Sequence, residues 1–196
     1  RLAENFANKK EMKNRSPFTF GLIATLLVLN TTTLPRANEL PFELLKIPAT
    51  QGSMAPNLCS FGDHFALSWI DRKSKGAATV RVASWNGNAF GEASTVATSK
   101  QMFANWADIP SVIEAPSGAL YAHWLDRISG ETYAYGIRIV RSTDRGKSWN
   151  PMGWLHNDTS PTEHGFVSFI PEGKRVRAFW LDGRAMAKEG GKMMLR

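Results

Sequence analysis

Apolar residues alternate with polar or small residues over short stretches in most of the chain after residue 45. In "TYAYGIRIV", for example, Tyr133, Tyr135, Ile137 and Ile139 fall on one face at a period of two. This period is typical of β-strands. No segment beyond residue 45 carries the 3.6-residue apolar stripe of an amphipathic helix. The pattern therefore predicts an all-β fold of short strands joined by turns.

Three of the apolar stretches resemble one another. They read "FALSWIDR" at 65–72, "LYAHWLDR" at 120–127 and "VRAFWLDGR" at 176–184. Their tryptophans are spaced by 55 residues (69 to 124) and then by 56 (124 to 180). A repeat of about 50 residues is typical of the four-stranded blade of a β-propeller. A further apolar segment precedes each stretch and another follows it, so we expect successive blades.

The number of blades bears on how much of a propeller the chain contains. From residue 50 there is room for about two and a half blades, and "KMMLR" at 192–196 falls inside an expected third strand. A closed propeller needs about four to eight blades. We therefore expect the chain to be the N-terminal part of a six-bladed protein of about twice its length. A fragment of this kind is expected to be inactive by itself.

The first 37 residues differ in composition from the rest. From Met12, the positive residues Lys13 and Arg15 precede an apolar run at 18–29. This run is too short to cross a bilayer, which takes about 20 residues, but it has the length of the apolar part of a signal peptide. We expect a leader at 1–11, a signal peptide at 12–37, and a partial propeller at 38–196 that is exported to the periplasm or the extracellular space. An uncleaved anchor or a buried core helix is the alternative for the apolar run.

Charge and cysteine content narrow the possible partners. The net charge of +7 would favour nucleic acid. However, residues 1–37 carry 6 basic and 2 acidic residues, which leaves 18 basic and 15 acidic residues in the remainder, without any basic run. We therefore expect no nucleic-acid partner. Cys59 is the single cysteine, which excludes an internal disulfide and a cysteine-based zinc site, and we expect neither a metal nor another cofactor.

The stretch "STDRGKSW" at 142–149 lies between the expected third and fourth strands of the middle blade. The side chains of Ser142 and Asp144 can accept hydrogen bonds from nearby backbone N–H groups. Gly146 can adopt a positive φ, and Trp149 can return into the blade as an apolar plug. These residues predict a fixed turn, which by itself performs no chemistry.

The order Ser-x-Asp-x-Gly-x-x-Trp in this stretch resembles the Asp-box, or BNR repeat, of sialidases and related propellers. The wider pattern "WADIPS", "TEHGFVS" and "WLDGR" resembles bacterial exported proteins of the exo-alpha-sialidase-like group over residues 50–196. The resemblance implies a glycoside hydrolase in which arginines bind the substrate carboxylate and a tyrosine, activated by a glutamate, is the nucleophile. The first of those arginines usually begins an Arg-Ile-Pro motif, which here reads Asp108-Ile109-Pro110.

The repeat also places candidate catalytic residues. Sixteen residues before each repeated tryptophan stand Ser53, Asp108 and His164. The first strand of a propeller blade lines the central channel, so these positions, together with Glu163, are expected to converge on one pocket. Asp108, Glu163 and His164 are the candidate catalytic residues, since carboxylates and imidazoles perform acid–base chemistry. Alternatively, Asp108 caps a strand, and Glu163 and His164 form a solvated pair in a loop.

Three further residues are candidates for substrate binding. Asp71-Arg72, Asp126-Arg127 and Asp182-Arg184 recur at the strand ends, and in each we expect the aspartate and the neighbouring arginine to form an ion pair. Gly183 breaks the spacing in the third, which makes Arg184 the candidate for binding an anion. Arginine suits the binding of a carboxylate. His156 and Asp158 lie in the loop that leads to Glu163, and loops near a pocket often carry binding residues. We expect His123 to be a satisfied core histidine, and Tyr133 and Tyr135 to pack as strand aromatics.

These observations predict a glycan substrate or ligand and leave three functions open. The first is an exported sialidase-like glycoside hydrolase. The second is a non-catalytic Asp-box propeller that binds a glycan or a protein partner. The third is a different hydrolase or lyase on the same scaffold, because the fold does not determine the function.

Overall fold

The computed structural model describes residues 43–61, 64–72 and 76–196, and residues 44–196 contain the fold. The expected leader and signal peptide lie outside the described residues. Among the residues that are described, no helix is long and apolar enough to span a membrane.

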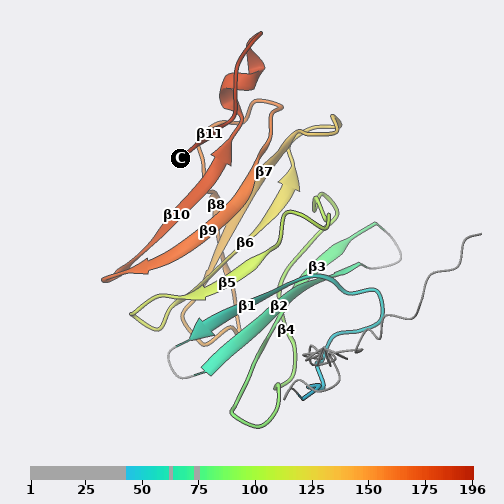
Figure 1. Ribbon diagram of the computed structural model, residues 1–196, viewed down its shortest axis with the longest axis vertical. Helices are drawn as coiled ribbons and strands as arrows, with labels where there is room; N and C mark the ends of the chain where they lie inside the picture. The colour runs from blue at the N-terminus through green and yellow to red at the C-terminus, as the bar shows by residue number, and fades with distance from the viewer. Residues whose placement is uncertain (1–42, 62–63, 73–75) are drawn as a thin grey trace, which may run out of the picture. The chain divides into compact units, whose positions relative to one another are not determined.

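Three antiparallel sheets follow one another along the chain (Figure 1). Each strand pairs with its neighbour in sequence, which is the strand order of a propeller blade. The first sheet contains β1 (Met54–Phe61), β2 (His64–Arg72), β3 (Ala78–Ser84) and β4 (Ser94–Ser99). The second contains β5 (Ser111–Glu114), β6 (Leu120–Arg127), β7 (Tyr135–Ser142) and β8 (Asn150–Trp154). The third contains β9 (His164–Glu172), β10 (Arg175–Asp182) and β11 (Met194–Leu195), with a short 3-10 turn at Arg184–Ala187.

The prediction of an all-β fold of successive propeller blades is confirmed. The described residues hold two four-stranded blades and three strands of a third. The strands arise from the period-two pattern, and Tyr133, expected on the face of β7, lies just outside that strand and is 66 % exposed. The expected total of six blades stays a prediction.

The three repeated tryptophans occupy the same position in the three sheets. Each lies on the second strand, and its indole Nε1 donates a hydrogen bond to the carboxylate two residues later, at 2.8, 2.9 and 3.3 Å. Each also pairs across the sheet with an arginine that lies in the third strand or, in the third blade, directly after it. The pairs are Trp69 with Arg81, Trp124 with Arg138, and Trp180 with Arg196. The 55-residue repeat in the sequence is therefore a repeat of the structure.

The ion pair expected between Asp182 and Arg184 of the third blade is confirmed, at 2.7 Å. The pairs expected in the first two blades are wrong. In the second blade, Asp126 pairs with Arg138 of β7 at 3.3 Å, while Arg127 lies over the Phe103 ring at 4.7 Å. Arg72 of the first blade likewise donates to the backbone carbonyl of Ala104. The physical reason is that successive side chains of a strand point to opposite faces.

Apolar side chains join neighbouring sheets. One cluster connects the first two sheets and includes Ile70, Val80 and Val112. A second cluster, centred on Leu125, Tyr135 and Ile137, has Val167 and Trp180 of the third sheet packed against it. These clusters fix the blades side by side and hold β1, β5 and β9, the first strand of each blade, in sequential contact.

Candidate functional site

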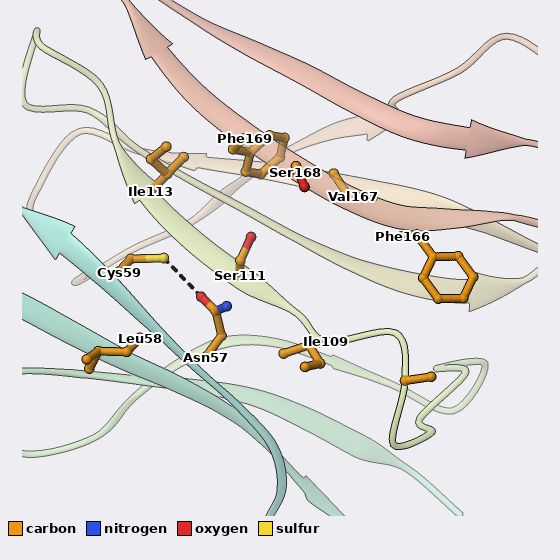
Figure 2. A pocket seen from close by; sticks show the side chains of 11 residues that line it. Asn57, Leu58, Cys59, Ile109, Ser111, Ile113, Phe166, Val167, Ser168 and Phe169 are labelled. Carbon is orange, nitrogen blue, oxygen red and sulfur yellow. Dashed lines mark hydrogen bonds between the residues drawn. The ribbon is translucent and has the colours of Figure 1, made fainter. Parts of the chain in front are cut away.

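A hollow of about 440 Å³ lies along the first strands of the three blades (Figure 2). Residues 57–59 of β1 and 166–169 of β9 line it, together with alternate residues from 107 to 113 in and before β5. Its volume falls within the range of about 300 to 1,000 Å³ that is usual for ligand sites. The candidate catalytic residues lie next to this wall but do not line it.

Asp108 connects the second blade to the third. It lies in the loop before β5 and is 8 % exposed. Its Oδ1 accepts a hydrogen bond from the backbone N–H of Phe166 at 3.1 Å, and its Oδ2 accepts one from Asn105 Nδ2 at 2.8 Å. The Asn105 Oδ1 in turn accepts the backbone N–H groups of Ala107 and Asp108. Asp108 therefore binds a backbone amide of the following blade.

Tyr135 binds the candidate carboxylate of Glu163 and lies near that of Asp108. Its hydroxyl donates a hydrogen bond to Glu163 Oε1, and its ring stacks on Phe103 at 4.1 Å between centroids. Gly165 makes the close packing with Asp108 feasible, because a Cβ on this glycine would lie 2.6 Å from Asp108 Oδ1 and 3.3 Å from Tyr135 Cε2. Burial raises the pKa of Tyr135, and the hydrogen bond to Glu163 and the charge of Asp108 raise it further. Tyr135 therefore stays protonated and holds Glu163 in place.

His156 is a neutral imidazole of defined tautomer. Its Nε2 accepts the backbone N–H of Ile137 at 3.1 Å, so its Nδ1 carries the proton and donates to the Asp158 carbonyl at 2.7 Å. Burial lowers the pKa of His156, and the neighbouring His164 lowers it further. Gly136 allows the ring to approach β7, because a Cβ there would lie 2.8 Å from His156 Nε2.

His164 is fully buried at the start of β9. Its Nε2 donates to Asp158 Oδ2 at 2.9 Å, and its Nδ1 lies 3.7 Å from Asp182 Oδ1. Its ring packs against the His156 ring at 4.0 Å between centroids, with an angle of 31° between the ring planes. Partial burial raises the pKa of Asp158, but hydrogen bonds from Ser160 and His164 outweigh this effect and leave the pKa below its usual value. Asp158 therefore orients the His164 ring, whereas the buried Nδ1 has no hydrogen-bond partner among the described residues.

Arg184 is engaged within the protein. Its Nε and Nη2 donate to the two oxygens of Asp182 at 2.8 and 2.7 Å, and its Nη1 donates to Asn157 Oδ1 at 3.2 Å. The hydrogen bonds to Asp182 raise the pKa of Arg184. Burial raises the pKa of Asp182, but the hydrogen bonds from Arg184 outweigh it and hold that pKa well below its usual range. A role for Arg184 in binding a substrate anion stays a prediction.

Five of the six candidate residues thus gather around the start of β9, in an assembly that we call the β9 cluster. Its members are His156, Asp158, Glu163, His164 and Arg184. Asp108 adjoins it through Tyr135. Ser53 does not join it, because its hydroxyl donates to Asp71 in the first blade at 2.6 Å. In the described part of the chain, no group of three or more His, Cys, Asp or Glu side chains could hold a metal ion.

Sequence analysis missed the roles of Asn105 and Tyr135 in this region, and it did not place Asp182 beside His164. The expectation for Tyr135 was packing alone, and its hydroxyl is what fixes Glu163. The position of Asp182 could have been inferred from the repeated Trp-x-Asp order, which marks a carboxylate at the end of each second strand.

The expectation that His123 is a satisfied core histidine is only half right. The ring is 2 % exposed and packs edge-on against Phe169 at 5.0 Å between centroids. However, neither ring nitrogen has a hydrogen-bond partner among the residues that the structure describes. Burial therefore lowers the pKa of His123 to about 3.

The stretch at 142–149 forms the turn between β7 and β8. Ser142 Oγ donates to Asp144 Oδ1 at 2.7 Å and accepts the backbone N–H of Gly146 at 2.9 Å. Asp144 also accepts the backbone N–H of Ser148 at 2.9 Å, and its hydrogen bonds, chiefly those from Ser148, lower its pKa. Gly146 has φ +79°, and Trp149 packs against the first core cluster. The turn lies between outer strands of the blade and contributes no residue to the β9 cluster.

No family model and no curated protein matches this chain. Solved structures do match its fold. An alpha-L-arabinanase from Penicillium chrysogenum, solved with arabinobiose, has 13% sequence identity and a TM-score of 0.50, over 73% of this chain and 45% of the arabinanase.

Two further structures match to the same extent. An alpha-L-arabinofuranosidase from Lactobacillus brevis has 11% identity and a TM-score of 0.51, over 79% of this chain and 55% of the enzyme. An endo-arabinase from Bacteroides thetaiotaomicron has 11% identity and a TM-score of 0.51, over 76% of this chain and 58% of the enzyme. The chain thus spans about half the length of these glycoside hydrolases, and the part it shares with them is a partial β-propeller.

Proposed function

We propose that the protein containing this chain is a glycoside hydrolase that acts on extracellular glycans. The observation that carries the proposal is the placement of two carboxylates, Asp108 and Glu163, around Tyr135 and next to a hollow of ligand size. Most glycoside hydrolases use such a pair of carboxylates at the glycosidic bond. The fold shared with three carbohydrate-cleaving enzymes supports the same class of reaction.

The two carboxylates have different surroundings, which suggests different roles. Glu163 is partly exposed and is held by the Tyr135 hydroxyl, so it is the group proposed to act on the glycosidic oxygen. Asp108 is nearly buried and accepts hydrogen bonds from a backbone amide and from Asn105. It is proposed as the negative charge that stabilises a developing positive charge on the sugar ring.

Two separate observations support two different substrates. The resemblance of "STDRGKSW" and "WADIPS" to sialidase-like proteins supports a sialoside. The shared fold supports a pentose polymer such as the arabinan that the names of the solved enzymes indicate. We propose a sialoside as the substrate, cleaved by the pair of carboxylates and not by the tyrosine nucleophile of sialidases. Cleavage of an arabinoside instead would redirect the proposal to that substrate.

Release of 4-methylumbelliferone from a sialoside and from an α-L-arabinofuranoside tests this function on the full-length protein. The variants Glu163→Gln and Asp108→Asn keep the size of each side chain and should each lower kcat by about 10²-fold or more, as expected for the loss of an acid–base group. Glu131→Gln, in an exposed loop, is the matched control and should leave kcat unchanged. Equal turnover by all three variants and the wild type would reject Asp108 and Glu163 as catalytic residues.

A non-catalytic propeller that binds a glycan is the second candidate function. Arg184, His156 and His164 all form hydrogen bonds to other residues of this chain, which supports a site without catalytic groups. Binding of a glycan without release of product by the wild-type protein would favour this function.

A further inference from the structure

Small polar residues occupy equivalent positions on the first strands of the three blades. Asn57, Ser111 and Ser168 lie on β1, β5 and β9, and each pairs with the residue that precedes the repeated tryptophan of its own blade. All three line the hollow (Figure 2). They are therefore equivalent positions of three successive blades that face one space.

Most of the hydrogen-bonding capacity of these residues is unused. Within the described residues, the Ser111 and Ser168 hydroxyls have no hydrogen-bond partner, and Asn57 uses only its Oδ1, which accepts the Cys59 thiol at 2.9 Å. Polar groups that line a hollow without partners are available to a ligand.

Phe166 provides an aromatic surface in the same hollow. It is 48 % exposed, and it has φ +53°, a left-handed conformation that is strained for a side chain of this kind. Its backbone N–H donates to Asp108 Oδ1, which holds the strained conformation. Fourteen residues before their tryptophans, the first and second blades have Ala55, also at φ +53° but buried, and Pro110. The bulged backbone thus recurs in the first blade, but among these blades only the third carries an exposed aromatic ring at this position.

We propose that the hollow binds one sugar ring, with its C–H face on the Phe166 ring and its hydroxyl groups on Asn57, Ser111 and Ser168. Sugars combine an apolar ring face with hydroxyl groups at the edge, and the hollow offers an aromatic ring beside amide and hydroxyl groups. The ligand class rests on the proposed function, but the binding does not require hydrolysis. Because Asp108 holds Phe166, a sugar on this ring lies beside a candidate catalytic carboxylate.

Calorimetric titration of the full-length protein with arabinobiose and with 3′-sialyllactose tests the site. Phe166→Ala should weaken the binding of the preferred sugar about tenfold, which corresponds to the loss of one well-packed aromatic contact. Ser168→Ala should weaken it about threefold, as expected for one hydrogen bond. Ile170→Ala is the matched control. Ile170 lies two residues after Ser168 on β9 and is 50 % exposed, but it does not line the hollow, so this variant should bind sugar as tightly as the wild type.

Phe166→Gly separates a role in binding from a role in folding. Glycine adopts a positive φ without strain, so this variant should melt at or above the temperature of Phe166→Ala and still bind sugar about tenfold more weakly than the wild type. Wild-type affinity in the two Phe166 variants, or no binding of either sugar by the wild type, would overturn the inference. If the Phe166 variants lose sugar binding and neither they nor the wild type release product, the sugar site is upheld and the hydrolase function is rejected. If the wild type releases product and Phe166→Ala has an unchanged KM, the hydrolase function is upheld and the sugar site is rejected.

Discussion

Trp124 and Arg138 lie opposite each other on β6 and β7, and Asp126 binds both of them. The indole Nε1 donates to Asp126 Oδ1 at 2.9 Å, and the guanidinium Nε lies 3.3 Å from Asp126 Oδ2. The same unit of tryptophan, aspartate and arginine recurs in the other two blades, where the ion pairs measure 3.7 and 3.6 Å. It fastens the second strand of each blade to the third.

Replacement of Asp126 should destabilise the fold. Asp126→Ala leaves the buried Trp124 indole and the Arg138 guanidinium without their acceptor, so we expect a loss of about 2 kcal/mol in the free energy of unfolding. Asp126→Asn keeps an acceptor for the indole and should lose about 1 kcal/mol. Urea unfolding measures both values, with the exposed Glu92→Ala as control. Equal stability of Asp126→Ala and the control would show that the unit contributes little.

Gly165 should not tolerate a side chain. In Gly165→Ala, the new methyl group would lie 2.6 Å from Asp108 Oδ1 and 3.3 Å from Leu125 Cδ1, so we expect a loss of about 2 kcal/mol from overpacking. Gly130→Ala is the control, because nothing lies within 4 Å of a Cβ at that position. Thermal unfolding of the two variants compares them directly. If both melt at the same temperature, Asp108 is free to move away, and the contact between the blades is looser than the structure indicates.

The turn between β7 and β8 should depend on Ser142. Ser142 is fully buried, and Ser142→Ala removes the acceptor of the Gly146 N–H, so the variant should lose about 1 to 2 kcal/mol of stability. Thr143→Ala, at the next and exposed position, should change stability by less than about 0.5 kcal/mol. Chemical denaturation distinguishes the two cases. The hydrogen-bonding role of Ser142 is wrong if the two variants unfold at the same denaturant concentration.

His123 should make the protein less stable in mild acid. Burial lowers the folded-state pKa of His123 to about 3, whereas an unfolded histidine has a pKa of about 6.5. Between these values the unfolded chain binds a proton that the folded chain does not. The contribution of His123 to stability therefore falls as the pH falls through this window, by at most about 1.4 kcal/mol per pH unit.

His123→Leu tests this dependence. Leucine has no unpaired nitrogen to bury, so the variant should be at least as stable as the wild type at pH 7. Its unfolding free energy should decline less steeply between pH 6 and pH 4, as measured by urea titrations at several pH values. The same slope in both proteins would mean that a buried water or a structural change stabilises the charged imidazole.

The sequence by itself determined the local structure and the repeat. The strands, the turn at 142–149 and the equivalence of Trp69, Trp124 and Trp180 followed from period-two patterning, turn residues and a fixed spacing, all of which act over short stretches of chain. The spacing also indicated Glu163 and His164 as candidate site residues. It could do so because equivalent positions of successive blades occupy equivalent places in the fold.

Only the tertiary structure decided which side chains meet. The partner of Asp126 is Arg138 on the next strand and not the adjacent Arg127, because strand register and the alternation of faces determine the contact. Likewise, the bond from Tyr135 to Glu163 and the bond from the Phe166 N–H to Asp108 depend on how two blades pack. These contacts join residues up to tens of positions apart, and no local pattern in the sequence encodes their distance or their hydrogen-bond geometry.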